Sequence, residues 1–155
     1  MDTFIANVSS PVGQWAVEGT DDAVVAVYLP HQPHVSSKGT PPRAVSSAVQ
    51  QLEEYFAGQR REFDVHLATE RATEFQRDVW NALVEIPFGE VRTYGEVAES
   101  VERPRASRAV GNANHANPWP IFVPCHRVVA TAGLGGYGGG DVVKRYLLNL
   151  EGLNY

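Results

Sequence analysis

The only cysteine of the chain lies in the stretch Asn117-Pro118-Trp119-Pro120-Ile121-Phe122-Val123-Pro124-Cys125-His126-Arg127-Val128, residues 117–128. The apolar run before Cys125 predicts a short strand that delivers the cysteine, and a histidine and an arginine follow it directly. Pro124 restricts its own backbone and that of Val123, so it fixes the direction in which the cysteine points. A thiol attacks as the thiolate, and a neighbouring His or Arg lowers its pKa from about 8.5 toward neutral. The stretch therefore predicts a reactive cysteine.

Simpler interpretations of this stretch stay open at this point. A solitary cysteine is usually a small buried hydrophobic residue. Neighbouring residues of an extended strand face opposite ways, so Cys125 and His126 can meet only if the chain turns there. With one cysteine the chain can form neither an internal disulfide nor a cysteine-based zinc cage, and we expect no metal.

Upstream of the cysteine the pattern predicts two short helices, over residues 94–101 and 105–115, with Pro104 between them. Such a pair indicates a helix-turn-helix, although many small helical domains contain one. At 100° per residue, one face of the second helix collects Arg105, Arg108, Asn112 and His115. The adjoining stripe is apolar and small, with Ala106, Ala109, Val110 and Ala113. This face suits a DNA groove, and the alternative is a polar face in contact with solvent.

The first third of the chain predicts a small sheet with one helix. Apolar alternation indicates an antiparallel meander of strands over residues 4–8, 15–17 and 23–29, followed by a proline-rich loop over 30–42. Helical spacing predicts a helix over 43–56 that Gly58 ends, and residues 63–67 resemble one more strand.

The rest of the chain predicts a mainly helical domain. Thr73 and Gln76 have the spacing of a capping box at the start of a helix that Pro87 and Gly89 end. A last helix is predicted over 142–151. We therefore expect a two-part α/β architecture, with an N-terminal domain over residues 1–69 and a C-terminal domain over 70–155.

The charge distribution qualifies the net charge of −5, which by itself argues mildly against nucleic-acid binding. Residues 1–69 hold four basic and eight acidic side chains, whereas residues 103–140 hold four arginines and no acidic residue. The latter segment could give one positive face. No apolar run approaches the roughly 18 residues of a membrane span, and the N-terminus lacks a basic signal-peptide start, so we expect a cytoplasmic protein.

Residues Pro124-Cys125-His126-Arg127-Val128 resemble the active-site signature of the O6-alkylguanine-DNA alkyltransferases. Further motifs follow in the order of that family and cover residues 73–152 almost continuously; residues 1–69 match only loosely. These motifs are Phe75-Gln76-Arg77-Asp78-Val79-Trp80, Ile86–Glu90 with Thr93–Ala98, Arg108–Ala113, Gly136–Gly140 and Lys144–Gly152. The resemblance implies a ribonuclease-H-like N-terminal domain and a C-terminal domain with a DNA-binding helix-turn-helix.

The resemblance also implies the chemistry. Cys125 would be the nucleophile and the alkyl acceptor, with His126 acting through a water as its base and Glu151 orienting that histidine. Tyr94 would donate a hydrogen bond to the guanine ring, and Asn117 would hold the turn before the cysteine. The reaction would be stoichiometric, because the thioether is not cleaved, and would need no cofactor.

The implied partner is double-stranded DNA that contains O6-alkylguanine. The alkyl group lies inside the duplex, so the nucleotide must be flipped out, and Arg108 would fill the gap. The DNA-contacting residues would be Tyr94, Arg105, Ala106, Arg108, Ala109, Gly111, Asn112 and Arg127. The base pocket would be lined by Tyr94, Pro120, Val128, Tyr137 and Gly138, with main-chain groups of Cys125 and Val128 at the base edge.

Two other functions stay open at this stage. One is a lesion-binding protein of the alkyltransferase-like kind, which does not transfer the alkyl group. Proteins of that kind lack the motif cysteine, whereas this chain has Cys125. The other is a cysteine hydrolase with Cys125 and His126, which would turn over repeatedly. The resemblance implies a monomer and leaves open whether O4-alkylthymine is also repaired. Bulky Trp119 and the glycine at position 138 could alter the pocket.

Overall fold

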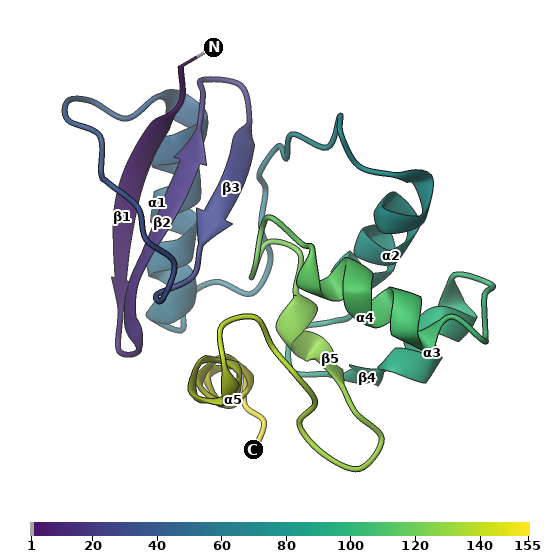
Figure 1. Ribbon diagram of the computed structural model, residues 1–155. Helices are drawn as coiled ribbons and strands as arrows, with labels where there is room; N and C mark the ends of the chain where they lie inside the picture. Colours follow the sequence, from purple (N-terminus) through teal and green to yellow (C-terminus); the bar gives the residue numbers. More distant parts are fainter. Residues whose placement is uncertain (1) are drawn as a thin grey trace. The chain divides into compact units, whose positions relative to one another are not determined.

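The structure is a computed structural model that describes residues 2–155, and Met1 lies outside them (Figure 1). The described chain divides into two compact units, of which the first ends at Glu70 and the second runs from Arg71 to Tyr155. No helix among residues 2–155 is both long and apolar enough to cross a membrane. The mixed α/β fold class expected from the sequence is confirmed.

The first unit contains a three-stranded antiparallel sheet in the order β1-β2-β3. Its strands are β1 (Phe4–Ser10), β2 (Gly13–Gly19) and β3 (Val24–Tyr28), which confirms the predicted meander. A two-residue turn joins β1 to β2, since Ser10 pairs with Gly13. The register shifts between Glu18 and Gly19, where β2 pairs with β3.

Helix α1 (Arg43–Phe56) packs on this sheet and has the predicted bounds (Figure 1). Its apolar residues recur at helical spacing and are buried, whereas the opposite face meets solvent. Val45, Leu52 and Tyr55 are almost fully buried, as are Trp15 and Val17 of β2. Burial of these side chains holds the sheet and the helix together.

The strand predicted over residues 63–67 does not form, and the prediction is wrong. Only Leu67 pairs with β3, through an isolated parallel bridge to Val24. The main chain of Asp64 bonds instead to the side chain of Gln51, whose Oε1 accepts from the Asp64 N–H at 2.8 Å. Gln51 Nε2 donates to the Asp64 carbonyl at 2.9 Å, so that a buried side chain takes the place of a strand partner.

The second unit begins with α2 (Glu74–Val84), and Thr73 and Gln76 form the predicted capping box. Helix α3 (Tyr94–Ser100) has a capping box of the same kind, in which Thr93 Oγ1 accepts from the Glu96 N–H at 3.1 Å. Glu96 Oε1 accepts from the Thr93 N–H at 2.8 Å in return. Two boxes therefore fix where these helices start.

Helix α4 (Ser107–His115) follows α3 after a short turn and packs against both α2 and α3. It starts two residues later than predicted, because Arg103, Pro104 and Arg105 belong to the turn. Ala106 is the N-cap residue and its carbonyl accepts from the Val110 N–H at 2.8 Å. Arg105 and Ala106 therefore precede the helix.

The chain then passes through a 3-10 turn, η1 (Cys125–Arg127), into β5 (Val128–Val129) and ends with α5 (Asp141–Leu150). Strand β5 pairs in parallel with β4 (Arg92–Thr93), which directly precedes α3. The strand predicted to deliver Cys125 is thus wrong: the cysteine opens a turn, and the strand begins three residues later.

Candidate active site around Cys125

The main chain before Cys125 is sharply bent. Pro124 has φ −78° and ψ 66°, the conformation of an inverse γ-turn, and the Cys125 N–H donates to the Val123 carbonyl at 2.7 Å. Ile121 is buried with φ 77°, a left-handed conformation that is rare for a β-branched residue. The turn that a Cys–His arrangement requires is therefore present at Cys125.

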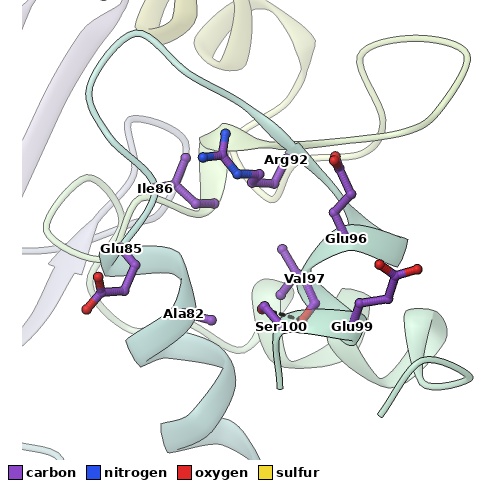
Figure 2. A pocket seen from close by; sticks show the side chains of 8 residues that line it. All are labelled: Ala82, Glu85, Ile86, Arg92, Glu96, Val97, Glu99 and Ser100. Carbon is purple, nitrogen blue, oxygen red and sulfur yellow. Dashed lines mark hydrogen bonds between the residues drawn. The ribbon is translucent and has the colours of Figure 1, made fainter. Parts of the chain in front are cut away.

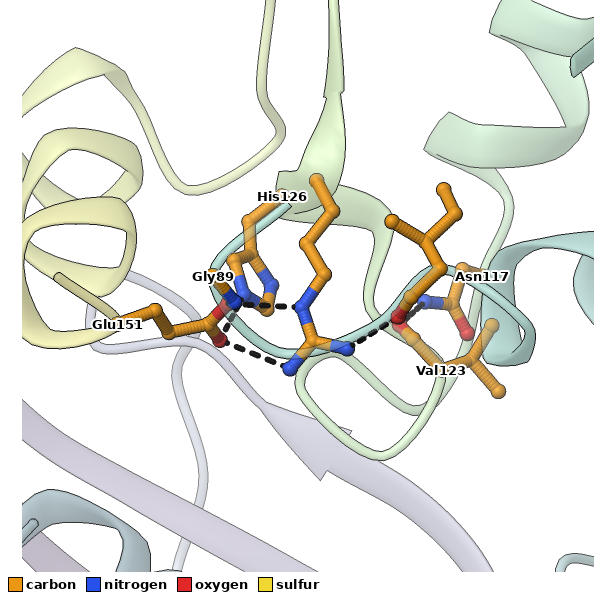
Figure 3. A network of polar contacts seen from close by, with 7 residues as sticks. Gly89, Asn117, Val123, His126 and Glu151 are labelled. Carbon is orange, nitrogen blue, oxygen red and sulfur yellow. Dashed lines mark hydrogen bonds and ion pairs between the residues drawn. The ribbon is translucent and has the colours of Figure 1, made fainter. Parts of the chain in front are cut away.

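His126 belongs to a buried polar network (Figure 3). Its Nε2 lies 2.6 Å from Glu151 Oε2, and neither side chain is exposed. An ionised carboxylate only accepts, so Nε2 carries the hydrogen and Nδ1 has the free lone pair. Nδ1 is buried without a hydrogen-bond partner among the described residues, and so it can accept a proton.

Arg127 completes this network. Its Nε donates to Glu151 Oε1 at 2.8 Å, and its second terminal nitrogen donates to Glu151 Oε2 at 3.0 Å. The other terminal nitrogen donates to the Ile86 carbonyl at 2.7 Å. Arg127 is only 5% exposed, so the prediction that it contacts DNA is corrected: it neutralises Glu151 inside the unit.

The network sets the charge states of its members. Burial raises the pKa of Glu151, but hydrogen bonds and charge from His126 and Arg127 outweigh burial and hold that pKa well below its usual range. Burial lowers the pKa of His126 despite the opposing effect of Glu151. The carboxylate and the guanidinium balance each other, and the imidazole stays neutral near pH 7.

The thiol itself has a different environment from the predicted one. Burial raises the pKa of Cys125, although hydrogen bonds from Asn117 and Tyr137 and the charge of Lys144 act in the opposite direction. The expectation that its neighbours lower this pKa toward neutral is therefore wrong. Arg127 forms an ion pair with Glu151, so its charge is balanced there and does not stabilise the Cys125 thiolate. Cys125 is a protonated thiol at rest and needs a base.

Asn117 makes two hydrogen bonds across the bend. Its Nδ2 donates to the Val123 carbonyl at 2.8 Å, and its Oδ1 accepts from the Trp119 N–H at 2.9 Å. Asn114, which the sequence reasoning missed, donates from Nδ2 to the Cys125 carbonyl at 3.2 Å. A signal was available, because Asn114 lies four residues after buried Val110, on the apolar stripe of the helix.

Tyr94 lies beside the glycine-rich segment that follows β5. Its hydroxyl donates to the Gly136 carbonyl at 3.4 Å. A Cβ on Gly135 would lie 3.3 Å from the Tyr94 ring and 3.0 Å from the Ala130 nitrogen, and Gly135 has φ 76°. Glycine at 135 therefore permits both the close approach and the backbone conformation.

Lys144 is a second residue that the sequence reasoning missed. It is fully buried, and its Nζ donates to the carbonyls of Val128 at 2.6 Å and Gly136 at 3.1 Å. Burial lowers the pKa of Lys144 to about 8. Lys144 lies on the same buried stripe as Leu147, Leu148 and Glu151, at and just after α5. Because charged residues are rarely buried, a lysine at this spacing in the sequence indicates a candidate functional residue.

The predicted DNA-contacting residues of α4 and of the turn before it lie largely on the surface. Arg105, Arg108, Ala109 and Asn112 are exposed, and Ala106 and Gly111 are half-buried. Among the predicted pocket residues, Pro120 and Val128 are buried, Tyr137 is half-buried and Gly138 is exposed. Trp119 is buried and its ring meets that of Trp80 edge-on at 5.4 Å, so it packs in the core.

A groove between α2 and α3 lies apart from these residues (Figure 2). Its polar rim is mainly acidic, with Glu85, Glu96 and Glu99 against Arg92, and none of the predicted site residues lines it. Among residues 2–155, no three His, Cys, Asp or Glu side chains come together in a group that could hold a metal ion.

Two family models match the chain. Residues 74–153 match the model described as "6-O-methylguanine DNA methyltransferase, DNA binding domain", and residues 5–69 match its "ribonuclease-like domain". This chain belongs to the O6-methylguanine DNA methyltransferase family. The ribonuclease-like description agrees with the topology expected for the N-terminal part.

Relatives of this methyltransferase family extend over most of the chain. The methylated-DNA–protein-cysteine methyltransferase of Mycolicibacterium paratuberculosis is 48% identical over 148 residues, which cover 93% of this chain and 89% of that protein. The constitutive enzyme of Bacillus subtilis is 38% identical over 161 residues, covering 98% and 97%.

A crystal structure of the Mycobacterium tuberculosis O6-methylguanine methyltransferase has a TM-score of 0.84 and 46% identity, and the match covers 97% of this chain and 93% of that one. A structure of the same organism's OGT in complex with DNA has a TM-score of 0.84 and 47% identity, covering 96% and 92%.

Proposed function

We propose that this chain repairs O6-alkylguanine in double-stranded DNA by transferring the alkyl group to Cys125. The observation that carries the proposal is the buried network in which His126 and Arg127, the two residues after the single cysteine, both bond to Glu151. This network keeps His126 neutral with a free Nδ1 lone pair, which is what a protonated thiol needs as its base. Family membership supplies the substrate class.

The reaction has one bond-forming and one bond-breaking event. The Cys125 thiol loses its proton to His126 through a water, and the sulfur attacks the alkyl carbon. The bond between that carbon and guanine O6 breaks, and its electron pair goes to the guanine. The guanine takes up one proton, so that unmodified guanine and an S-alkylcysteine are the products.

The remaining predicted residues have supporting roles in the proposal. Tyr94 donates a hydrogen bond to the base and so stabilises the departing guanine, and Asn117 holds the bend before Cys125. Arg108 replaces the flipped nucleotide in the base stack, because a planar cation can stack on bases and contact phosphate. The protein acts as a monomer in the cytoplasm.

Stoichiometry tests this proposal against the cysteine hydrolase. Duplex DNA with one O6-methylguanine is mixed in tenfold excess with the protein, and the lesion that remains is quantified over time. The proposal predicts a single burst that stops when one lesion per protein molecule has been lost. Continued loss beyond that plateau would establish turnover, and no loss with retained duplex binding would favour the lesion-binding alternative.

A further inference from the structure

The carbonyl of Cys125 accepts two hydrogen bonds inside the protein. One comes from the N–H of Val128, which closes the 3-10 turn, and the other from Asn114 Nδ2 at 3.2 Å. A carbonyl has two lone pairs, so the turn alone would already satisfy this buried group. The fold therefore does not need Asn114 to pair the carbonyl.

Asn114 also carries an unfavourable feature. The residue is 6% exposed, and its Oδ1 is buried with no hydrogen-bond partner in the described part of the chain. Its amide orientation is fixed, because Nδ2 must face the carbonyl that it bonds. A buried acceptor without a partner destabilises the folded state, and an apolar side chain of the same size would avoid this.

The position of Asn114 connects two parts of the proposed machinery. It lies on α4, whose outer face exposes Arg108 and Asn112, and it contacts the first residue of the turn that holds the nucleophile. Asn117 bonds the carbonyl of Val123, two residues before Cys125. Two asparagines three residues apart therefore hold the main chain on both sides of the cysteine.

We propose that Asn114 is a positioning residue for alkyl transfer, which fixes the Cys125 peptide against α4 so that the sulfur faces its reaction partners. The inference rests on the proposed function and deepens it. Without the amide, the turn keeps its own hydrogen bond but gains freedom to rotate. The sulfur then spends less time at the attacking position, and a misplaced nucleophile reacts more slowly.

The experiment compares the wild type with Asn114→Leu, which keeps the branched shape of the side chain and removes the donor. Asn81→Ala is the matched control, because Asn81 is exposed on α2 and lies outside the proposed site. Single-turnover rates are measured on a duplex with one O6-methylguanine and on free O6-benzylguanine. Binding to undamaged duplex and the midpoint of urea unfolding are measured for each protein.

We expect Asn114→Leu to react about tenfold more slowly with both substrates. The free energy of one hydrogen bond, if it is lost from the transition state, corresponds to a rate change of about that size. Its DNA affinity should equal that of the wild type, and its urea midpoint should be equal or higher, since the unpaired Oδ1 has gone. Asn81→Ala should match the wild type throughout. Rates within twofold of the wild type on both substrates would overturn the proposal. A lower rate on the DNA substrate alone, together with weaker binding to undamaged duplex, would overturn it as well.

A second readout does not depend on alkyl transfer. The rate of Cys125 modification by iodoacetamide is followed against pH, and a displaced sulfur should move the midpoint of this profile to higher pH in Asn114→Leu. An unchanged midpoint and rate would contradict the positioning role. If the leucine variant does not fold, Asn114→Ala carries the same measurements, because alanine also removes the donor and adds no bulk. A wild type that transfers nothing would reject the proposed function, whereas the iodoacetamide profiles would still decide the role of Asn114.

Discussion

Glu151 has the most demanding surroundings of any single residue in the site. It accepts from His126 Nε2 at 2.6 Å and from Arg127 Nε at 2.8 Å, and its side chain is fully buried. A terminal nitrogen of Arg127 is a third donor, at 3.0 Å from Oε2, and the Gly89 N–H is a more distant fourth, at 3.3 Å from Oε1. One carboxylate therefore orients the base and neutralises a buried guanidinium, which explains why a charged residue near the chain end is buried at all.

Removing this charge should destabilise the protein. Glu151→Gln leaves Arg127 buried without a counter-charge, and loss of one partner of a buried pair costs about 3–5 kcal/mol. Urea unfolding at pH 7 measures the change. Glu90→Gln is the control, because Glu90 pairs with Arg92 at the surface and its side chain is 53% exposed. A Glu151→Gln protein as stable as this control would contradict the account.

The low pKa of Glu151 fixes the pH dependence of that contribution. The unfolded carboxyl binds a proton at pH values where the folded one stays ionised, so acid favours unfolding. The stabilisation is complete above the ordinary carboxyl pKa of about 4.5 and decreases as the pH falls below it. Repeating the comparison with Glu151→Gln between pH 3 and 7 checks this direction.

Protonation of His126 should set the fall of the transfer rate at low pH, the acid limb of the pH–rate profile. Burial lowers its pKa, so the neutral base persists below pH 6.5, the ordinary midpoint of histidine. Single-turnover rates measured between pH 4.5 and 8 should therefore stay level until well below 6.5 and then fall. An acid limb centred above pH 6.5 would mean that His126 is not the neutral base described here, and His126→Gln should lose the limb together with most of the rate.

Among the elements, α3 depends on its cap. Thr93→Ala removes the side-chain acceptor of the Glu96 N–H and half of the capping box, which costs about 1 kcal/mol. Urea unfolding measures the loss. Thr131→Ala serves as the control, because Thr131 is exposed in the loop after β5. Equal stabilities for the two variants would show that the box does not hold the start of α3.

Helix α4 gives a prediction about DNA. Among the four arginines of the acid-free segment 103–140, Arg127 is paired with Glu151 and Arg103 lies 3.7 Å from Asp78. Arg105 and Arg108 are exposed and form no ion pair within the described residues. Each phosphate contact contributes about −0.9 to the slope of log Kobs against log salt, so this pair predicts a shallow slope near −2.

Arg108→Ala should weaken binding to undamaged duplex and reduce the size of that slope by about one. Fluorescence anisotropy between low and moderate salt measures both quantities. Arg43→Ala, at the exposed start of α1 in the other unit, should leave the slope unchanged. A slope that is unaffected by Arg108→Ala would show that α4 does not contact phosphate through this residue.

The elements also show which features the sequence could predict. Local signals sufficed where one helix sets its own ends, as for α1 and for the Thr73 cap of α2. The two failures come from non-periodic contacts, one between residues far apart in the sequence and one within a tight turn. The main chain of Asp64 pairs with the side chain of Gln51 instead of a strand, and Cys125 opens a turn because Pro124 bends the chain. Such contacts leave no periodic pattern in the local sequence.

At the scale of the whole molecule, the motif order placed His126 and Glu151 in one site, although 25 residues separate them in the sequence. Physical reasoning on the sequence could not assign Arg127, since a cation beside a cysteine is compatible with DNA contact and with a buried ion pair. A polar residue on a buried helical stripe marks both Asn114 and Lys144 in the sequence, but their partners could not be predicted, because these are main-chain carbonyls. Every residue type can supply such a carbonyl.

The central claim is that Cys125 keeps the alkyl group. Its most direct test is the intact mass of the protein after reaction with a duplex that contains one O6-methylguanine, followed by peptide mapping. We predict a gain of one methylene group on the peptide that contains Cys125, and no gain for Cys125→Ser. An unchanged mass while the lesion disappears, or a gain on any other residue, would contradict the account.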